Sequence, residues 1–269
     1  MLKLHVLASG SKGNAAIVED AEAGQGILID CGVTKKAFLE GCAACGFDPA
    51  DLRAVLVTHE HADHTKGLGV VMRGLAKLGI AHLPLISGAK VLQASKDAAS
   101  VCGLCKAMPL LEDGAEFPIE GSGLCVRAFQ TSHDAVQSFG FRIMDAHGDA
   151  LGFMTDTGTV TASAHEALSC CRVLAIEANH DVRMLEAAPY PSHVKRRIAS
   201  DAGHLSNEQA ASDLALLAHS GLEAVVAMHI SENSNDYTLP VRALESALEE
   251  TGCAASVRAA FQRRPVSAG

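Results

Sequence analysis

The sequence has few aromatic residues and no excess of basic ones. Phe, Trp and Tyr make up 4% of the 269 residues, with no tryptophan and two tyrosines. A long groove that stacks the bases of a single strand on aromatic rings would therefore have few platforms. The 22 lysines and arginines are outnumbered by 31 aspartates and glutamates, which gives a formal net charge of −9. This charge excludes a protein that coats nucleic acid with a generally basic surface.

Long apolar runs are also absent. No stretch reaches the roughly 18 uninterrupted apolar residues of a membrane-spanning helix, and the first residues lack the apolar core of a signal peptide, so we expect a cytoplasmic protein. With 48% hydrophobic and 20% charged residues, the composition is that of a globular chain. Because no linker or repeat divides the sequence, we expect a single domain over residues 1–269, with residues 263–269 as a loose tail.

The nine cysteines are an odd number, which is more typical of free thiols than of a disulfide framework. Two pairs, Cys42 with Cys45 and Cys102 with Cys105, have the Cys-x-x-Cys spacing of metal or redox sites, and a four-thiolate zinc site would join them. Each pair lies in a stretch rich in Ala, Leu and Gly that we expect to be helical. Residues three apart share a helix face, so we favour thiols packed in the core.

Apolar runs and turn signals predict alternating strands and helices, as in an α/β protein. The expected strands cover residues 4–8, 26–30, 53–58, 124–130, 140–144, 151–155, 173–177, 224–228 and 256–261. The expected helices cover residues 34–46, 66–78, 89–101, 206–219 and 240–250. The fourth helix opens on Ser206-Asn207-Glu208-Gln209, which has the form of a capping box.

The strongest chemical signal is His59-Glu60-His61-Ala62-Asp63-His64, directly after the strand expected at 53–58. Three imidazoles and an aspartate within six residues have no evident structural role. Alternation along a loop can point His59 and His61 the same way and turn Asp63 and His64 to a neighbouring position. One segment can then supply ligands to two adjacent metal ions. The alternative is a solvated loop that happens to be rich in histidine.

This segment matches in full the His-x-His-x-Asp-His signature of the metallo-β-lactamase superfamily, which the sequence therefore resembles. The resemblance extends over nearly the whole chain. Residues 8–14, 177–181 and 203–207 look like the YycJ (WalJ) branch, which is related to ribonuclease Z. It implies an αββα sandwich, in which two mixed β-sheets are flanked by helices and a dinuclear metal site lies at one edge between the sheets.

The resemblance also implies the remaining metal ligands. His133 lies in Thr131-Ser132-His133-Asp134, Asp156 in Thr155-Asp156-Thr157-Gly158, and His229 in Met228-His229-Ile230-Ser231. The implied ligands are His59, His61, His133 and Asp156 for one ion and Asp63, His64, His229 and Asp156 for the other. Zinc and manganese both suit such imidazole and carboxylate donors. An aspartate just before a glycine is also common in ordinary turns, so Asp156 alone would be a weak indication.

A dinuclear site of this kind predicts hydrolysis. Two ions roughly 3.5–4 Å apart can hold a bridging hydroxide and polarise an ester or phosphoryl oxygen. By the resemblance, Asp63 ligates a metal ion and also orients or deprotonates the nucleophilic water. His204 is our candidate donor of a proton to the leaving oxygen, because it precedes a helix N-terminus that could itself hold an anion. The alternative is that His204 is an ordinary loop histidine.

Several further residues are candidates for support or substrate contact. Asp30, at the end of an expected strand, could hold the second ring nitrogen of a ligating histidine or could cap a turn. Ser9 and Asn14 belong to a Gly-rich loop that either offers amides to a phosphate or forms a tight turn between strands; it lacks the Lys-Ser/Thr ending of a P-loop. Asn179 and His180 resemble a signature of the branch, with substrate contact or scaffolding as their only evident roles.

The sequence gives weaker information about the substrate. The cluster Lys195-Arg196-Arg197 could contact a phosphate backbone or could be a solvated helix face. Phe139, Phe141 and Tyr190 are the aromatic residues to consider for base stacking. The resemblance favours a phosphodiesterase acting on nucleic acid, such as an exonuclease that cuts DNA from the 5′ end. The alternative, which the net charge fits better, is a hydrolase of a lactone, thioester or cyclic phosphodiester on the same site.

Overall fold

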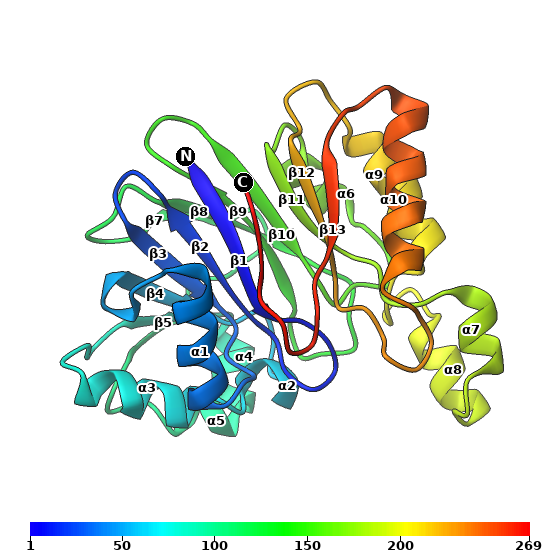
Figure 1. Ribbon diagram of the computed structural model, residues 1–269. Coiled ribbons are helices and arrows are strands. Elements are labelled where there is room, and N and C mark those ends of the chain that lie inside the picture. The colour runs from blue at the N-terminus through cyan, green and yellow to red at the C-terminus, as the bar shows by residue number, and fades with distance from the viewer.

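Two seven-stranded β-sheets lie face to face in the computed structural model, which describes residues 1–269 (Figure 1). The strands are β1 (Leu2–Ala8), β2 (Ala15–Asp20), β3 (Gln25–Ile29), β4 (Leu52–Leu56), β5 (Pro84–Ile86), β6 (Lys106–Met108), β7 (Glu116–Pro118), β8 (Cys125–Gln130), β9 (Phe139–Met144), β10 (Ala150–Met154), β11 (Val173–Glu177), β12 (Ala224–Met228), β13 (Ser256–Ala259) and β14 (Val266–Ala268). The first sheet has the order β14-β1-β2-β3-β4-β5-β6, and the second has the order β13-β12-β11-β10-β9-β8-β7.

Helices cover the outer faces of both sheets. They are α1 (Lys35–Cys45), α2 (Ala62–Thr65), α3 (Leu68–Lys77), α4 (Ala89–Ala94), α5 (Lys96–Ala99), α6 (Ala162–Leu168), α7 (Val182–Ala187), α8 (Ser192–Ile198), α9 (Asn207–Leu217) and α10 (Thr238–Thr251), with a short 3₁₀ helix, η1 (Pro49–Asp51). Figure 1 shows α1 and α3 outside the first sheet, α6, α9 and α10 outside the second, and α7 with α8 projecting beyond the sheets. None of these helices combines the length and apolar character that a membrane-spanning helix requires.

Strands β10, β11 and β12 form a parallel ribbon in the second sheet, and each of their residues is buried. The sequence of a parallel strand that is covered on both faces is a continuous apolar run rather than an alternating pattern. This explains why the sequence identifies these strands so clearly. Polar site residues then follow abruptly at their carboxyl ends.

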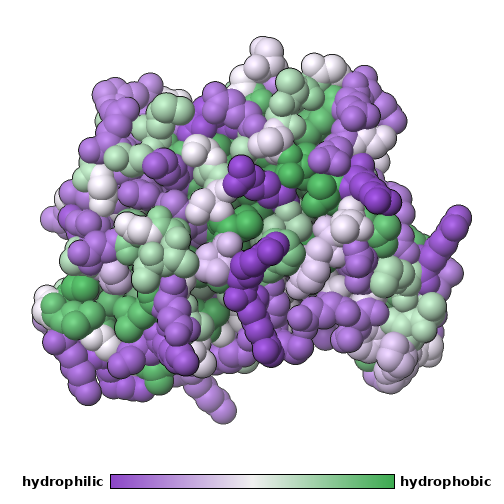
Figure 2. Space-filling view, in the orientation of Figure 1, coloured by the Kyte–Doolittle hydropathy of each residue, from purple (hydrophilic) through white to green (hydrophobic).

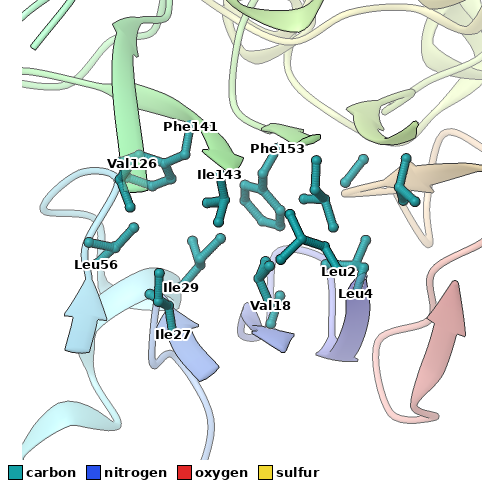
Figure 3. Packing of buried hydrophobic residues seen from close by; sticks show 14 of the residues in the cluster. Leu2, Leu4, Val18, Ile27, Ile29, Leu56, Val126, Phe141, Ile143 and Phe153 are labelled. Carbon is teal, nitrogen blue, oxygen red and sulfur yellow. The ribbon is translucent and has the colours of Figure 1, made fainter. Parts of the chain in front are cut away.

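The main apolar core lies between the two sheets (Figure 3). Leu4 of β1 and Ile27 of β3 share one buried cluster with Phe141 of β9 and Phe153 of β10. A second cluster joins the first sheet to α1 and α3, and a third joins the second sheet to α6, α9 and α10. The layers are therefore helix, sheet, sheet and helix, which confirms the predicted αββα sandwich. Because one core contains residues of both sheets, we propose that residues 1–269 form a single domain.

Most strands and helices expected from the sequence are present, with boundaries shifted by a few residues. The helix expected over residues 89–101 is divided at Ser95, whose hydroxyl accepts a hydrogen bond from the amide of Ala98 and so begins α5. The strands β2, β5, β6 and β7 and the helices α6, α7 and α8 were not expected. All of them are at most seven residues long, and so short a segment carries little periodic signal.

The prediction of a loose tail over residues 263–269 is wrong. Residues 266–268 form β14, which pairs antiparallel with β1 in the register of Leu4 with Ala268 and Val6 with Val266. The partner strand lies about 260 positions away in the sequence, and three residues are too few to show an alternating pattern. Only the edge of the folded sheet makes this segment a strand.

The four-thiolate zinc alternative is also wrong. All nine cysteines are free, and no group of side chains arranged to hold a metal ion includes a cysteine. Cys42 and Cys105 are buried in the apolar cluster beneath α1 and α3, whereas Cys102 is exposed. One thiol of each pair is thus packed as a small apolar side chain, as the sequence favoured.

Candidate metal centre

The candidate ligands gather at one edge of the sandwich, where strands of both sheets end. His59 follows β4, Asp156 follows β10 and His229 follows β12. Asp156 and His229 have positive φ angles of 54° and 51°, and Asp30, after β3, has a φ of 58°. Such backbone is costly for residues other than glycine and persists only where surrounding contacts impose it. The strand ends therefore turn sharply to aim these side chains into the site.

Three histidines form the first group of candidate ligands. The ring centroid of His59 is 4.6 Å from that of His61 and 5.1 Å from that of His133. The rings of His61 and His133 are also 5.1 Å apart. One nitrogen of each ring lies within 4.8 Å of the other two, which is close enough for one metal ion to bind all three.

Asp63, His64 and His229 form the second group, and Asp156 lies between the groups. The Nε2 atoms of His64 and His229 are each 3.6 Å from Oδ2 of Asp63. Oδ2 of Asp156 is 3.3 Å from Nε2 of His64, and its Oδ1 is 3.8 Å from Nε2 of His133. The structure thus brings together all seven residues that the resemblance implies as ligands, with one carboxylate placed to reach both groups.

Two buried nitrogen atoms in these groups lack a hydrogen-bond partner. They are Nε2 of His59 and Nε2 of His229, whose side chains are almost completely inaccessible. An unsatisfied buried polar atom is costly, and native proteins contain few of them. Imidazole nitrogens and carboxylate oxygens are donors for zinc and for manganese. The residues present therefore fit divalent metal ions.

The charges of the site also favour a cation. Burial lowers the pKa of His59 well below its ordinary value, so that ring stays neutral. Burial opposes ionisation of Asp156, but His229 and His64 hold its pKa well below the usual range. Burial likewise opposes protonation of His229, yet Asp156 raises its pKa to about 10. The ionised carboxylates thus create a negative potential that a bound cation would neutralise.

Asp30 and Thr58 support the segment from His59 to His64, which we call the ligand loop. Oδ2 of Asp30, which is 1% exposed, lies 2.7 Å from Nδ1 of His64, leaving Nε2 of that ring to face the site. The amide and hydroxyl of Thr58 donate to the same carboxylate, at 2.9 Å each. The Thr58 hydroxyl also lies 2.9 Å from Nδ1 of His59. Orientation of a ligating histidine was one of the two roles that the sequence left open for Asp30, whereas Thr58 was not singled out from the sequence.

Ser9, Asn14, Asn179 and His180 are all buried and contact the protein, not the solvent. The Ser9 hydroxyl accepts a hydrogen bond from the His229 amide at 2.8 Å. Nδ2 of Asn14 lies 3.0 Å from Nε2 of His64, and Nδ2 of Asn179 donates to the carbonyl oxygen of His229 at 2.8 Å. The loop that carries Ser9 and Asn14 joins the antiparallel strands β1 and β2, so it forms the expected tight turn and supports the site.

A buried carboxylate that sequence reasoning did not assign lies next to the ligands. Glu177 ends β11, is 0% exposed, and accepts the amide of Thr157 at 2.9 Å. Its Oε1 is 2.8 Å from Nδ1 of His204. Burial opposes ionisation, but His204 lowers the pKa of Glu177 to about 2. A glutamate at the end of an otherwise apolar strand is the signal that could have identified it.

His204 lies at the mouth of the site. Its side chain is 18% exposed, and its ring centroid is 5.1 Å from those of His133 and His229. Because Nδ1 is engaged by Glu177, Nε2 is the nitrogen available to a bound molecule. The ring therefore belongs to the same site as the candidate ligands.

The three basic residues on α8 differ in their contacts. Arg197 pairs with Asp134, the neighbour of His133, and Nζ of Lys195 donates to the carbonyl oxygen of Glu186 at 2.5 Å. Arg196 is exposed and has no ion pair or hydrogen bond. The pair with Asp134 joins α8 to the edge of the site, and Arg196 is the cation of this cluster that remains available.

Two of the aromatic residues considered for base stacking cannot serve in that way. Phe139 and Phe141 are 2% and 0% exposed and lie in the core between the sheets. Tyr190 is half-buried, and its hydroxyl accepts a hydrogen bond from Nδ2 of Asn233 at 2.8 Å. Which face of β9 is buried depends on the packing of the sheets, which the sequence did not reveal.

Glycine is required where the ligand loop meets the segment after β3. A Cβ atom on Gly32 would overlap the carbonyl oxygen of Asp63, and its own amide donates to the carbonyl oxygen of Asn14 at 2.8 Å. The amide of Cys31 likewise donates to the carbonyl oxygen of His64 at 2.7 Å. The backbone after β3 thus supports the Asp63–His64 turn directly.

Comparison with known proteins gives consistent matches. The family model described as the Beta-lactamase superfamily domain matches residues 25–230. The protein named Exodeoxyribonuclease YycJ of Bacillus anthracis is 32% identical over 251 residues, which cover 93% of this chain and 90% of that protein. The metallo-beta-lactamase fold protein YhfI of Bacillus subtilis superposes with a TM-score of 0.70 at 17% identity, covering 99% of both chains. The short form of human tRNase Z superposes with a TM-score of 0.64 at 16% identity, covering 98% of both chains. At such identities, the two structural matches show a shared fold.

Proposed function

This chain belongs to the beta-lactamase superfamily, and from that premise we propose that it is an exodeoxyribonuclease that hydrolyses phosphodiester bonds with two divalent metal ions. The observation that carries the proposal is the placement of Asp156 between two groups of three candidate ligands. The likeness to an exodeoxyribonuclease over 93% of the chain supports the substrate class. A cytoplasmic location stays a prediction.

We assign His59, His61 and His133 to one ion and Asp63, His64 and His229 to the other, with Asp156 between them. Zinc and manganese both suit this donor set. When bound, such ions lower the pKa of water and polarise phosphoryl oxygens. Three protein ligands and a shared carboxylate leave each ion open to water and substrate.

Asp63 is the residue we assign to positioning the nucleophilic water. Its side chain is 24% exposed, whereas that of Asp156 is 3% exposed, so Asp63 is the more accessible of the two carboxylates. Nδ2 of Asn14 lies 3.4 Å from Oδ2 of Asp63 and limits its rotation. A carboxylate held in this way can accept a proton from a water molecule on its accessible side.

His204 is the residue we assign to the leaving oxygen. Glu177 fixes the ring through Nδ1 and leaves Nε2 facing the mouth of the site. A protonated imidazole there can donate its Nε2 proton to the 3′ or 5′ oxygen as the phosphodiester bond breaks. The ionised Glu177 carboxylate is anchored by backbone amides of Thr157 and Leu205, so the ring has a fixed orientation.

Replacing His204 with alanine is expected to slow DNA hydrolysis by about 10²-fold, and Glu177→Gln by about tenfold. The reason is that an alkoxide leaving group needs a proton. Turnover of bis-p-nitrophenyl phosphate should change little, because p-nitrophenolate is a stable anion. Metal content and both rates would be measured for each variant, with His147→Ala in the exposed turn between β9 and β10 as the control. An equal loss on both substrates would contradict this role of His204.

The substrate side of the site is bordered by α7 and α8. The pair between Arg197 and Asp134 places α8 beside His133, and Arg196 is exposed on the same helix. A phosphate backbone that leaves the site along α8 would meet this guanidinium. The net charge of −9 makes such local positive groups the relevant ones for binding a polyanion.

The experiment that tests the function uses end-labelled DNA and RNA, single- and double-stranded, together with bis-p-nitrophenyl phosphate and added manganese or zinc. We expect progressive shortening of DNA from one end, with release of mononucleotides. Metal analysis of the same preparation should give about two ions per chain. Cleavage of the small diester without shortening of any polymer would overturn the nuclease proposal and favour a small-molecule hydrolase.

A further inference from the structure

A groove of about 630 Å³ lies beside the candidate metal centre and contains none of its ligands. Its floor comes from Leu7 and Ala8 at the end of β1, one wall from α1, and the other wall from the segment that leads into β14. Figure 1 shows α1 and the red C-terminal segment on either side of β1. The volume lies within the roughly 300–1,000 Å³ of typical ligand sites. We call it the α1–β1 groove.

The lining of the α1–β1 groove is apolar with a positive rim. Lys12, Lys66 and Arg263 line it, whereas Glu40 is its one acidic residue. Figure 2 shows strongly hydrophilic residues, in deep purple, crossing the middle of this face beside apolar surface in green. Because Lys12 pairs with Glu232, the cations of the rim without a carboxylate partner are Lys66 and Arg263, and in a protein of net charge −9 they mark a local site for an anion.

The groove shares a wall with the metal centre. Lys66 is two residues after His64, and its Nζ donates to the carbonyl oxygen of Lys12 at 2.9 Å. Gly32 lines the groove on one side and supports the backbone of Asp63 on the other. The groove and the metal centre therefore lie on opposite sides of a single layer of backbone that contains Gly32.

One of the cations is fully available. Nζ of Lys12 pairs with Glu232 at 2.5 Å, whereas Arg263 is exposed and has no ion pair or hydrogen bond. Its position is fixed by the preceding residue, because Gln262 accepts the amide of Lys12 at 2.8 Å and donates to the carbonyl oxygen of Gly13 at 2.9 Å. Arg263 is thus an unpaired charge on an anchored backbone.

We propose that the α1–β1 groove binds the nucleotides of the DNA strand next to the scissile phosphodiester. Their bases lie on the apolar floor, and their phosphates contact Lys12, Lys66 and Arg263. The inference rests on the proposed nuclease function, because it assigns a second part of the same substrate. Few aromatic residues are accessible for base stacking, so in this proposal the apolar floor of the groove contacts the bases instead.

Two pairs of matched variants test the groove. Ala44→Trp fills it from an exposed position of α1, whereas Ala43→Trp adds the same side chain on α1 outside the groove. Arg263→Glu reverses a lining charge. Arg264→Glu makes the same change in a residue whose guanidinium instead lies 3.7 Å above the Phe261 ring.

Binding of a 3′-labelled 12-nucleotide single strand would be followed by fluorescence anisotropy with calcium in place of the catalytic metal, at several salt concentrations. We expect Ala44→Trp and Arg263→Glu each to raise Kd about tenfold. Arg263→Glu should also reduce the salt slope by about 1. Both control variants should stay within about twofold of the unmodified protein. Turnover of bis-p-nitrophenyl phosphate should be unchanged in all four, because this diester is too small to extend into the groove.

The outcomes separate the two proposals. If the unmodified protein shortens DNA but the groove variants bind and cleave like their controls, the groove is not part of the substrate site and the nuclease proposal stands. If it binds the strand through the groove but shortens no DNA, the nuclease proposal fails and binding by the groove stands. If it neither binds nor shortens the strand, both fail. If an unlabelled mononucleotide displaced the labelled strand more strongly than the unlabelled 12-mer did, the assignment of the groove to a DNA strand would be overturned.

Discussion

Replacing Asp63 with alanine is expected to lower DNA hydrolysis by about 10³-fold, because the change removes a metal ligand and the carboxylate that positions the water. The fold should persist. The Asp63 side chain is 24% exposed, and Asn14 makes the one protein hydrogen bond to its carboxylate. The rate on end-labelled DNA, the metal content and the thermal midpoint would be measured together.

His61→Ala offers an independent check on the same centre. His61 begins α2 without a side-chain capping bond and is only half-buried, so its removal leaves no buried group unsatisfied. We expect hydrolysis to fall by about 10³-fold in a folded protein, as for Asp63→Ala. Glu250→Ala, an exposed acidic residue near the end of α10, is the control and should retain full activity. Unaltered activity in Asp63→Ala would refute the mechanism.

Adding zinc or manganese to metal-free protein is expected to raise its thermal stability substantially. Ions that bind only the folded state contribute about 4 kcal/mol when their free concentration is about 1,000 times Kd. For a chain of this size that corresponds to roughly 8 °C in the thermal midpoint. The physical basis is the buried Nε2 atoms of His59 and His229, which lack partners, and the ionised Asp156 beside them.

The measurement is a thermal melt of each variant with chelator and with metal, so that every protein serves as its own reference. His59→Ala and His229→Ala should lose most of the shift caused by metal, whatever their stability in chelator. His193→Ala, on the surface of α8, should keep the full shift. A shift of the same size in His59→Ala as in the unmodified protein would exclude this residue from the metal centre.

The sequence identified the parts of this protein whose signals are local. The segment from His59 to His64 concentrates its donors within six residues. Apolar runs marked β10, β11 and β12, which are buried on both faces, and β4, in which only Arg53 is partly exposed. The capping box at Ser206 and Gln209 is present as expected. Each of these features depends on neighbours a few positions away, which periodicity and spacing can reveal.

The other candidate ligands needed the family resemblance, since nothing in their local sequence distinguishes them from turn residues. His133, Asp156 and His229 each follow a strand by a few residues, and the segment from His59 to His229 spans most of the chain. Their meeting depends on the strand order of two sheets and on left-handed backbone at Asp156 and His229. No local pattern specifies either property.

By itself, therefore, the sequence determined the class of fold, most of its strands and helices, and the histidine motif after β4. Only the tertiary structure decided that Glu177 holds His204, that Phe139 and Phe141 face the core, that residues 266–268 complete a sheet, and that a cationic groove lies beside the centre. The physical reason is that strand pairing and sheet packing join residues far apart in the chain. The exposed or buried face of a strand residue is fixed only when its partner layer is in place.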